Sequence, residues 1–403
     1  MDQGFKHYLT VTGGYWAFTI TDGAIRMLVV LYFHGLGYSP LEIAMLFLFY
    51  EFFGIVTNLV GGWLGARVGL NRCMNIGMIM QIGALLMLTV PDAWLSVAYV
   101  MVAQAISGIA KDLNKMSAKA GVKLFLPDKS EKKLFRWVAI LTGSKNALKG
   151  AGFFIGALLL AWLEFRGALI ALSALLLVAL IITWTLLPGG LGKSASKPKF
   201  SQIFSKSPQV NRLSAARFFL FGARDIWFVV GLPVFLYAEL GWSFTEVGAF
   251  FALWVIGYGF VQGSAPAMLR SFSRRDPDGS MVAGAAFALL AVPVAIALAM
   301  SQGWDLQLVI IAGLSLFGIA FAINSAVHSY LIVSWSEREH VSMNVGFYYM
   351  ANAGGRLAGT LLSGWVYQSH GLTGCLWWSA GFVLAAALIS LLLPKQAAPI
   401  APG

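Results

Sequence analysis

The sequence predicts an all-α membrane protein of twelve transmembrane helices arranged in two pseudo-symmetric six-helix bundles. Of its 403 residues, 59% are hydrophobic and only 11% are charged, whereas about 25% of the residues in a typical soluble domain are charged. Apolar stretches of about 20 residues, the length that crosses a bilayer as a helix, recur along the chain. A transmembrane β-barrel would instead show shorter strands of alternating polarity.

The apolar stretches divide into twelve expected spans, six on each side of a polar connection. We expect residues 1–188 to form the first bundle, 189–208 a cytoplasmic linker and 209–403 the second bundle. The first residues lack the charged start and cleavage site of a signal peptide, so the first span should be retained. The expected spans are 9–34, 41–65, 73–91, 94–121, 136–161, 166–188, 209–237, 243–268, 280–301, 305–334, 342–368 and 371–393.

The positive charges of the loops predict the orientation. With the N-terminus in the cytoplasm, nearly all loop lysines and arginines fall on the cytoplasmic side, and the opposite loops hold only Arg166. Cytoplasmic loops of membrane proteins carry such an excess, so both termini are expected in the cytoplasm. The net charge of +11 then reflects topology, and no basic soluble domain remains to bind nucleic acid.

Local repeats support two homologous halves. In such proteins the substrate binds at the interface of the halves, which move against each other to give alternating access. The same registers align Asn58 with Gln262 and Lys145 with Asn352. The matches in chain order are 36–43 with 240–247, 108–114 with 318–324, and Lys149 and Gly152 with Arg356 and Gly359.

Several cations lie far from the end of any expected span. A charged side chain in the middle of a bilayer costs roughly 3 kcal/mol, so these residues are expected to face a water-lined cavity that receives an anion. The cations are Arg26, Lys145, Lys149, Arg224 and Arg356.

Lys145, Lys149 and Arg356 form the expected centre of this anion site. The two lysines are one helical turn apart on one face, and neither is near enough to a span end to reach the interface. Arg356 matches Lys149 in the second half, and its own span contains no nearby acid. A guanidinium binds phosphate or carboxylate in two-pronged fashion, and an ammonium acts as a point charge.

Two further cations have acidic neighbours. Arg26 follows Asp22 by one turn and Arg224 directly precedes Asp225. Such pairs are structural, serve in gating or proton coupling, or bind substrate, and the sequence leaves these roles open. Glu51 stands alone in an apolar stretch, and it is a candidate proton carrier because burial raises the pKa of a carboxylate.

Other polar residues are candidates for the cavity wall. Lys111 and Lys115 end the fourth span, where they either form its positive cytoplasmic cap or line the inner mouth of the cavity. Asn324 and His328 lie on the tenth span and Asn352 on the eleventh; a lone histidine of this kind is more often a packing residue.

No catalytic, metal or cofactor site is expected. Cys73 and Cys375 begin the third and twelfth spans, on opposite membrane faces, so they cannot pair or share a metal. The chain has no HExxH, CxxC or plausible Ser-His-Asp arrangement.

The segment Gly62 to Arg72 resembles the loop signature of the major facilitator superfamily. Ala66 replaces the usual aspartate and Leu70 the usual arginine, which puts the gating role of that aspartate in doubt. Gly143, Gly152 and Gly156 have the spacing of the antiporter motif of this superfamily, but Ala157 stands in place of its proline.

Nearly the whole chain resembles the ArsJ organoarsenical efflux permeases of this superfamily. The resemblance is carried by TDGAIRMLVV, GLGYSPLEIAMLFLFYEFFG, SGIAKDLNKMSAKAG, ILTGSKNALKG, the FLFGARD segment and GFYYMANAGGRLAGTLLSGWVYQ. It implies export of 1-arseno-3-phosphoglycerate across the bacterial inner membrane, which gives arsenate resistance. The substrate would come from glyceraldehyde-3-phosphate dehydrogenase acting on arsenate. We expect a monomer, with proton antiport through Asp22, Glu51 or Asp225.

Three alternatives remain. The first is a transporter or exchanger of other phosphorylated metabolites, which the cations permit equally well. The second is a membrane receptor or assembly protein whose charges form structural pairs, although the excess of cations over acids argues against it. The third is a membrane enzyme, for which the sequence lacks a recognisable catalytic set.

Overall fold

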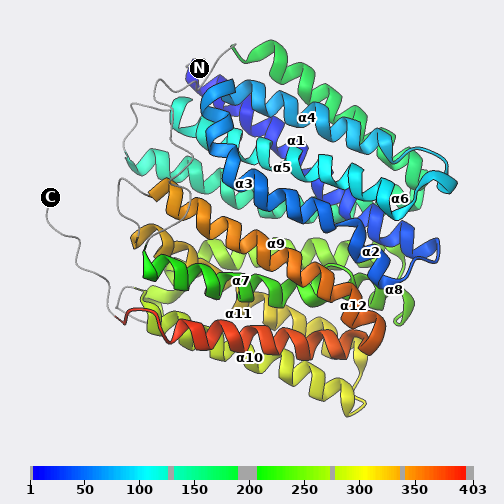
Figure 1. Ribbon diagram of the computed structural model, residues 1–403, viewed down its shortest axis with the longest axis vertical. Coiled ribbons are helices and arrows are strands. Elements are labelled where there is room, and N and C mark those ends of the chain that lie inside the picture. The colour runs from blue at the N-terminus through cyan, green and yellow to red at the C-terminus, as the bar shows by residue number, and fades with distance from the viewer. Residues whose placement is uncertain (1–2, 126–130, 189–206, 273–276, 336–340, 396–403) are drawn as a thin grey trace, which may run out of the picture. The chain divides into compact units, whose positions relative to one another are not determined.

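A computed structural model describes residues 3–125, 131–188, 207–272, 277–335 and 341–395, and its assigned elements in these ranges are helices (Figure 1). One of them is a short 3-10 turn, Asp92–Trp94. The α-helices are α1 (Gln3–Gly35), α2 (Pro40–Leu46), α3 (Leu48–Val68), α4 (Leu70–Met87), α5 (Val97–Phe125), α6 (Glu131–Leu186), α7 (Pro208–Phe228), α8 (Gly231–Ala238), α9 (Phe244–Phe272), α10 (Gly279–Ser301), α11 (Leu306–Ser334) and α12 (Val341–Ser390).

Each of the twelve expected spans corresponds to a helical segment. Among the described residues, eight helical stretches are long and apolar enough to cross a membrane. Two of these, α6 and α12, each contain two spans, because a single non-helical residue, Glu164 or Gly371, turns the chain. The helices α4 and α5 supply the remaining two spans. The predicted fold class is therefore confirmed.

The chain forms two compact units. Unit 1 comprises residues 1–38, 45–200 and 236–256, and unit 2 comprises 39–44, 201–235 and 257–403. Each unit thus contains most of one half of the sequence and a short segment of the other half. Most of the linker lies outside the described residues, and the expected domain boundaries at residues 188 and 209 stay a prediction.

Glycines allow two pairs of helices to pack closely, α1 with α6 in unit 1 and α7 with α12 in unit 2. Helix α6 carries Lys149, and α12 carries Arg356. In unit 1, a Cβ atom on Gly152 of α6 would collide with the backbone oxygen of Ile20 on α1. In unit 2, a Cβ on Gly359 of α12 would lie 2.7 Å from the backbone oxygen of Gly222 on α7. Gly152 and Gly359 were matched in the sequence repeat, so the repeated glycines serve the same packing role.

The turn before the second span and the turn before the eighth also share one geometry. The backbone amide of Ser39 donates to Glu42 Oε2 at 2.8 Å, and that of Ser243 donates to Glu246 Oε2 at 2.8 Å. In both cases the serine hydroxyl accepts from the glutamate amide at 3.3 Å. These are capping boxes, and their recurrence supports the internal repeat.

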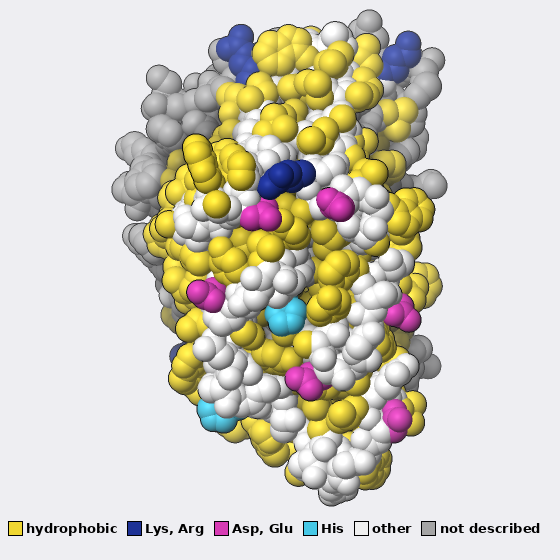
Figure 2. Space-filling model, turned by 90° about the vertical axis from the view of Figure 1, so that its right-hand side faces the viewer, with side chains coloured by type: hydrophobic (Ala, Val, Ile, Leu, Met, Phe, Trp, Pro, Cys, Tyr) yellow, Lys and Arg dark blue, Asp and Glu magenta, His cyan; other side chains and the backbone are white. Residues whose placement is uncertain are grey.

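Large apolar side chains cover much of the surface. On the face seen in Figure 2, hydrophobic side chains are spread over the whole described surface, among polar groups and backbone. Trp162, Leu253 and Phe260 are among the most exposed. Such broad apolar exposure suits contact with lipid, and the chain is a multi-pass membrane protein. Cys73 and Cys375 are free and buried, as expected.

Candidate functional site

Unit 1 contains a buried ion pair between α1 and α3. Arg26 Nη2 donates to Glu51 Oε1 at 2.8 Å, and the two side chains are 5% and 1% exposed. The guanidinium also lies over the rings of Phe47 and Tyr50, at 5.0 and 5.2 Å from their centroids. Glu51, which stands alone in its stretch of sequence, therefore has a cationic partner from another helix.

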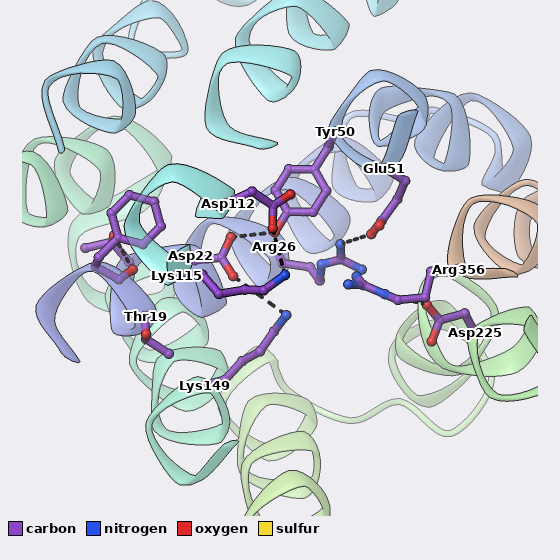
Figure 3. A network of polar contacts seen from close by, with 12 residues as sticks. Thr19, Asp22, Arg26, Tyr50, Glu51, Asp112, Lys115, Lys149, Asp225 and Arg356 are labelled. Atoms are coloured by element: carbon purple, nitrogen blue, oxygen red, sulfur yellow. Dashed lines mark hydrogen bonds and ion pairs between the residues drawn. The ribbon is translucent and has the colours of Figure 1, made fainter. Parts of the chain in front are cut away.

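A second group in unit 1 is centred on Asp22. The hydroxyl of Tyr50 donates to Asp22 Oδ1 at 2.5 Å, and Lys149 Nζ lies 3.7 Å from Asp22 Oδ2. Lys111 Nζ lies 4.0 Å from the centroid of the Tyr50 ring, a cation–π contact. Figure 3 shows the Lys149 side chain extending from α6 toward Asp22.

The third group in unit 1 is centred on Lys115 of α5. Its ammonium donates to Asp112 Oδ1 at 3.0 Å and to Asn58 Oδ1 at 2.9 Å. The other oxygen of Asp112 is buried and has no hydrogen-bond partner among the residues that the structure describes. Lys115 is therefore not only a positive cap of its span, because it lies within a polar network of three residues.

In unit 2, one carboxylate holds two arginines. Asp225 Oδ1 accepts from Arg224 Nε at 2.7 Å, and Asp225 Oδ2 accepts from Arg356 Nε at 3.2 Å. Asp225 is completely buried, while both arginines are partly accessible. The sequence reasoning considered only the span of Arg356, which contains no acid, whereas the carboxylate partner comes from α7.

Unit 2 also contains a buried arginine that the sequence reasoning missed. Arg217 of α7 is 4% exposed. Its Nε donates to Asn352 Oδ1 at 3.0 Å, and its Nη1 donates to the carbonyl and the hydroxyl of Ser325 at 3.3 and 3.0 Å. Arg217 precedes Arg224 by seven residues, or two helical turns. That spacing on one helix face was the available signal.

The remaining predicted residues lie on the same helices. Asn324 and His328 are buried on α11, and both amide atoms of Asn324 and Nδ1 of His328 have no hydrogen-bond partner in the described part of the chain. Lys145 is half-buried on α6, one turn before Lys149. Tyr50 and Asp112 also belong to the network, although the sequence analysis did not single them out.

Pairing does not cancel the positive charge. Among the described residues, the cluster in unit 1 has three carboxylates, Asp22, Glu51 and Asp112, and five cations, which leaves two positive charges in excess. The cations are Arg26, Lys111, Lys115 and Lys149, together with Lys145 one turn before Lys149 on α6. The cluster in unit 2 has three arginines and one carboxylate, Asp225, which again leaves two. The cations expected to face a cavity are therefore partly compensated by carboxylates, and this count does not depend on which of the described groups pair. The described part of each unit therefore carries a net positive charge in its interior.

Twelve spans in two halves, with buried charges inside, define a membrane transporter. The family model of the Major Facilitator Superfamily matches residues 11–321 and 213–402. The chain belongs to this superfamily. No curated protein matches the sequence.

Solved transporters share the fold at low sequence identity. A bacterial homologue of the iron transporter ferroportin in an inward-facing state is 16% identical, with a TM-score of 0.68 over 96% of this chain and 98% of that one. A mutant of the nucleoside transporter NupG is 12% identical, with a TM-score of 0.72 over 97% and 98%. The human organic anion transporter MFSD10 (TETRAN) is 17% identical, with a TM-score of 0.67 over 97% and 100%.

Proposed function

We propose that this transporter is a secondary active exporter of a small organic anion that carries both an arsenate ester and a phosphate, 1-arseno-3-phosphoglycerate, and that it confers arsenate resistance. The observation that carries the proposal is the excess of buried positive charge in each unit. The identity of the anion rests on the resemblance to the organoarsenical permeases. Arginine and lysine bind an arsenate group in the same way as a phosphate group, so the cations alone do not identify the substrate.

Lys149 and Arg356 are the proposed principal substrate contacts, together with Lys145. Lys149 lies 3.7 Å from Asp22 and Arg356 lies 3.2 Å from Asp225, and both cations are partly accessible. A loose pair of this kind can exchange its carboxylate for a substrate oxyanion at lower cost than the tighter, fully buried pair of Arg26 and Glu51. Arg26, Lys111, Lys115, Arg224, Asn324, His328 and Asn352 are the further proposed binding residues.

Asp22, Glu51 and Asp225 are the proposed points of proton coupling. Each holds at least one cation, so protonation of a carboxylate changes the positive charge that is available to the substrate. We propose proton antiport, with both termini in the cytoplasm and a bacterial inner membrane as the location. Replacing each acid in turn by its amide should identify the coupling group as the variant whose transport no longer responds to a pH gradient.

Uptake into everted membrane vesicles tests the function. Freshly generated 1-arseno-3-phosphoglycerate should accumulate, and inorganic arsenate should not. Lys149→Gln and Arg356→Gln should abolish uptake at unchanged protein levels. The matched control, Arg166→Gln, removes an exposed arginine that bonds Asp92 and should transport normally. Transport of arsenate alone would exclude the proposed substrate, and normal transport by both variants would exclude the proposed contacts.

A second candidate is export or exchange of other phosphorylated metabolites. The cations recognise negative oxygens and do not distinguish arsenate from phosphate. The same vesicles loaded with 3-phosphoglycerate decide between the two. Uptake of 3-phosphoglycerate as fast as that of the arsenate ester would favour the broader substrate range.

A further inference from the structure

The guanidinium of Arg217 is buried, and no carboxylate pairs with it in the part of the chain that the structure describes. Among the described residues its hydrogen-bond and ring partners are neutral: the Asn352 amide, the Ser325 carbonyl and hydroxyl, and the rings of Phe221 and Tyr348, whose centroids are 3.9 and 5.1 Å away. A buried charge without an ionic partner is costly. The other two arginines of this cluster share Asp225, so Arg217 accounts for one of the two excess charges of unit 2.

The repeat shows which partner is missing. In unit 1, Asn58 contacts the cation Lys115, and Asp112 neutralises it. In unit 2, Gln262, which matches Asn58, donates to Ser325 Oγ at 3.2 Å, and Ser325 matches Lys115. Arg217 supplies the cation there. In the register that aligns 108–114 with 318–324, the counterpart of Asp112 is Ala322, which is buried.

The surroundings of Arg217 supply additional hydrogen-bond donors. The hydroxyl of Tyr258 and the amide of Gln262 converge on Ser325 Oγ, at 3.3 and 3.2 Å. Arg217 uses Nε and Nη1 in its described hydrogen bonds, and none of these uses Nη2. Asn324, whose buried side-chain amide has no described partner, adjoins Ser325 on α11. Guanidinium, hydroxyl and amide donors are the set that binds an oxyanion.

We propose that Arg217, with Ser325, Tyr258, Gln262 and Asn352, forms a second oxyanion-binding position in unit 2, two helical turns along α7 from Arg224. Its ligand is the phosphate, arsenate or carboxylate group of the transported anion, which takes the place of the missing counterion. This inference rests on the proposed function and adds a binding residue to it. The anion would contact the Arg217 position and the group around Arg356 either one after the other during transport, or at the same time through its two charged ends.

The test compares Asn352→Asp and Arg217→Gln in purified full-length protein. In N352D the new carboxylate would lie against the guanidinium, so the variant should unfold at a higher temperature than the wild type. The same carboxylate should weaken binding of 3-phosphoglycerate about 10- to 100-fold, the range for a charge-assisted contact. R217Q should weaken binding to a similar extent. Affinity is read at constant ionic strength from the rise of the unfolding temperature with ligand concentration.

Arg212→Gln is the matched control, because Arg212 lies on the same helix, is exposed and donates to the carbonyl of Leu392. The R212Q variant should bind 3-phosphoglycerate with the same affinity as the wild type. Inorganic phosphate and glycerate, used as separate probes, show which end of the anion the position takes. Unchanged affinity in N352D and R217Q would assign Arg217 to structural support and overturn the inference, while the proposed function would stand. Absence of saturable 3-phosphoglycerate binding by the wild type would overturn the inference, and only absence of 1-arseno-3-phosphoglycerate uptake in the vesicle assay would overturn the proposed function as well.

Discussion

Glu164 adopts a backbone conformation that normally requires glycine. Its φ and ψ are 57° and −179°, and its side chain is exposed. The equivalent turn in the second half places Gly371 at 62° and −165°. Glu164→Gly should therefore raise the free energy of unfolding by about 1–2 kcal/mol, because such conformations cost non-glycine residues about 1–3 kcal/mol. Thermal unfolding of the purified protein measures the gain.

Glu164→Ala is the control for this prediction. Alanine keeps the Cβ atom and removes the carboxylate, so it should leave the unfolding temperature almost unchanged. If the alanine variant were stabilised as much as the glycine variant, the charge of Glu164 would be the cause and backbone strain would not.

At the same scale, the sequence singled out several of the cations that the structure places in charged clusters, but not how they are neutralised. Lys149, Arg224 and Arg356 were recognised because they interrupt apolar stretches. The partner of Arg356 was missed because Asp225 is distant in sequence and reaches it only when α7 packs on α12. Arg217 was missed because it lies nearer the start of its span, where a positive residue is usual.

At the scale of elements, the number of spans followed from hydropathy, whereas the breaks within them did not. The expected seventh span is interrupted between α7 and α8. Pro233, in the first turn of α8, has no amide hydrogen to continue the helical hydrogen bonds of α7. The amides of Val230 and Gly231 both donate to Ser363 Oγ of α12, each at 3.1 Å. The proline was visible in the sequence, but a cap supplied by a helix more than a hundred residues away was not.

Ser363→Ala should destabilise the protein by about 1–3 kcal/mol, because it leaves two buried amides without an acceptor. Ser363→Thr keeps the hydroxyl and should recover part of the stability. The unfolding temperatures of the two variants measure the difference. Equal loss in both would indicate that the size of the side chain at this buried position decides, and that the hydrogen bonds do not.

The close approach of α7 to α12 gives another prediction at this scale. A Cβ atom on Gly355, in the first span of α12, would collide with the backbone oxygen of Phe218. Nothing lies within 4 Å of the corresponding position on Gly381, in the second span of α12. Gly355→Ala should cost about 1–3 kcal/mol, since the two helices must separate. Gly381→Ala should be tolerated. The contrast between these alanine variants in thermal unfolding isolates the packing, and a tolerated Gly355→Ala would show that α7 and α12 can adjust.

At the scale of the whole molecule, the fold alone does not select the solute. Proteins that share it include a homologue of an iron transporter, a nucleoside transporter and an organic anion transporter. Among the described residues, the cluster of unit 1 has five cations and three carboxylates, and that of unit 2 has three cations and one carboxylate. Under the proposed function, this balance should favour an anion over a metal cation or a neutral nucleoside.

Competition in the vesicle assay should therefore rank solutes by their negative charge. At equal concentration and ionic strength, 3-phosphoglycerate should inhibit transport more than glycerate, and glycerol should not inhibit. A nucleoside and Fe²⁺ should also have no effect. Each charge that pairs with a partly buried cation contributes about 1.5–3 kcal/mol, or about 10- to 100-fold in affinity. If glycerol or the nucleoside competed as well as 3-phosphoglycerate, shape would govern recognition, and the excess of lysine and arginine would need a structural explanation.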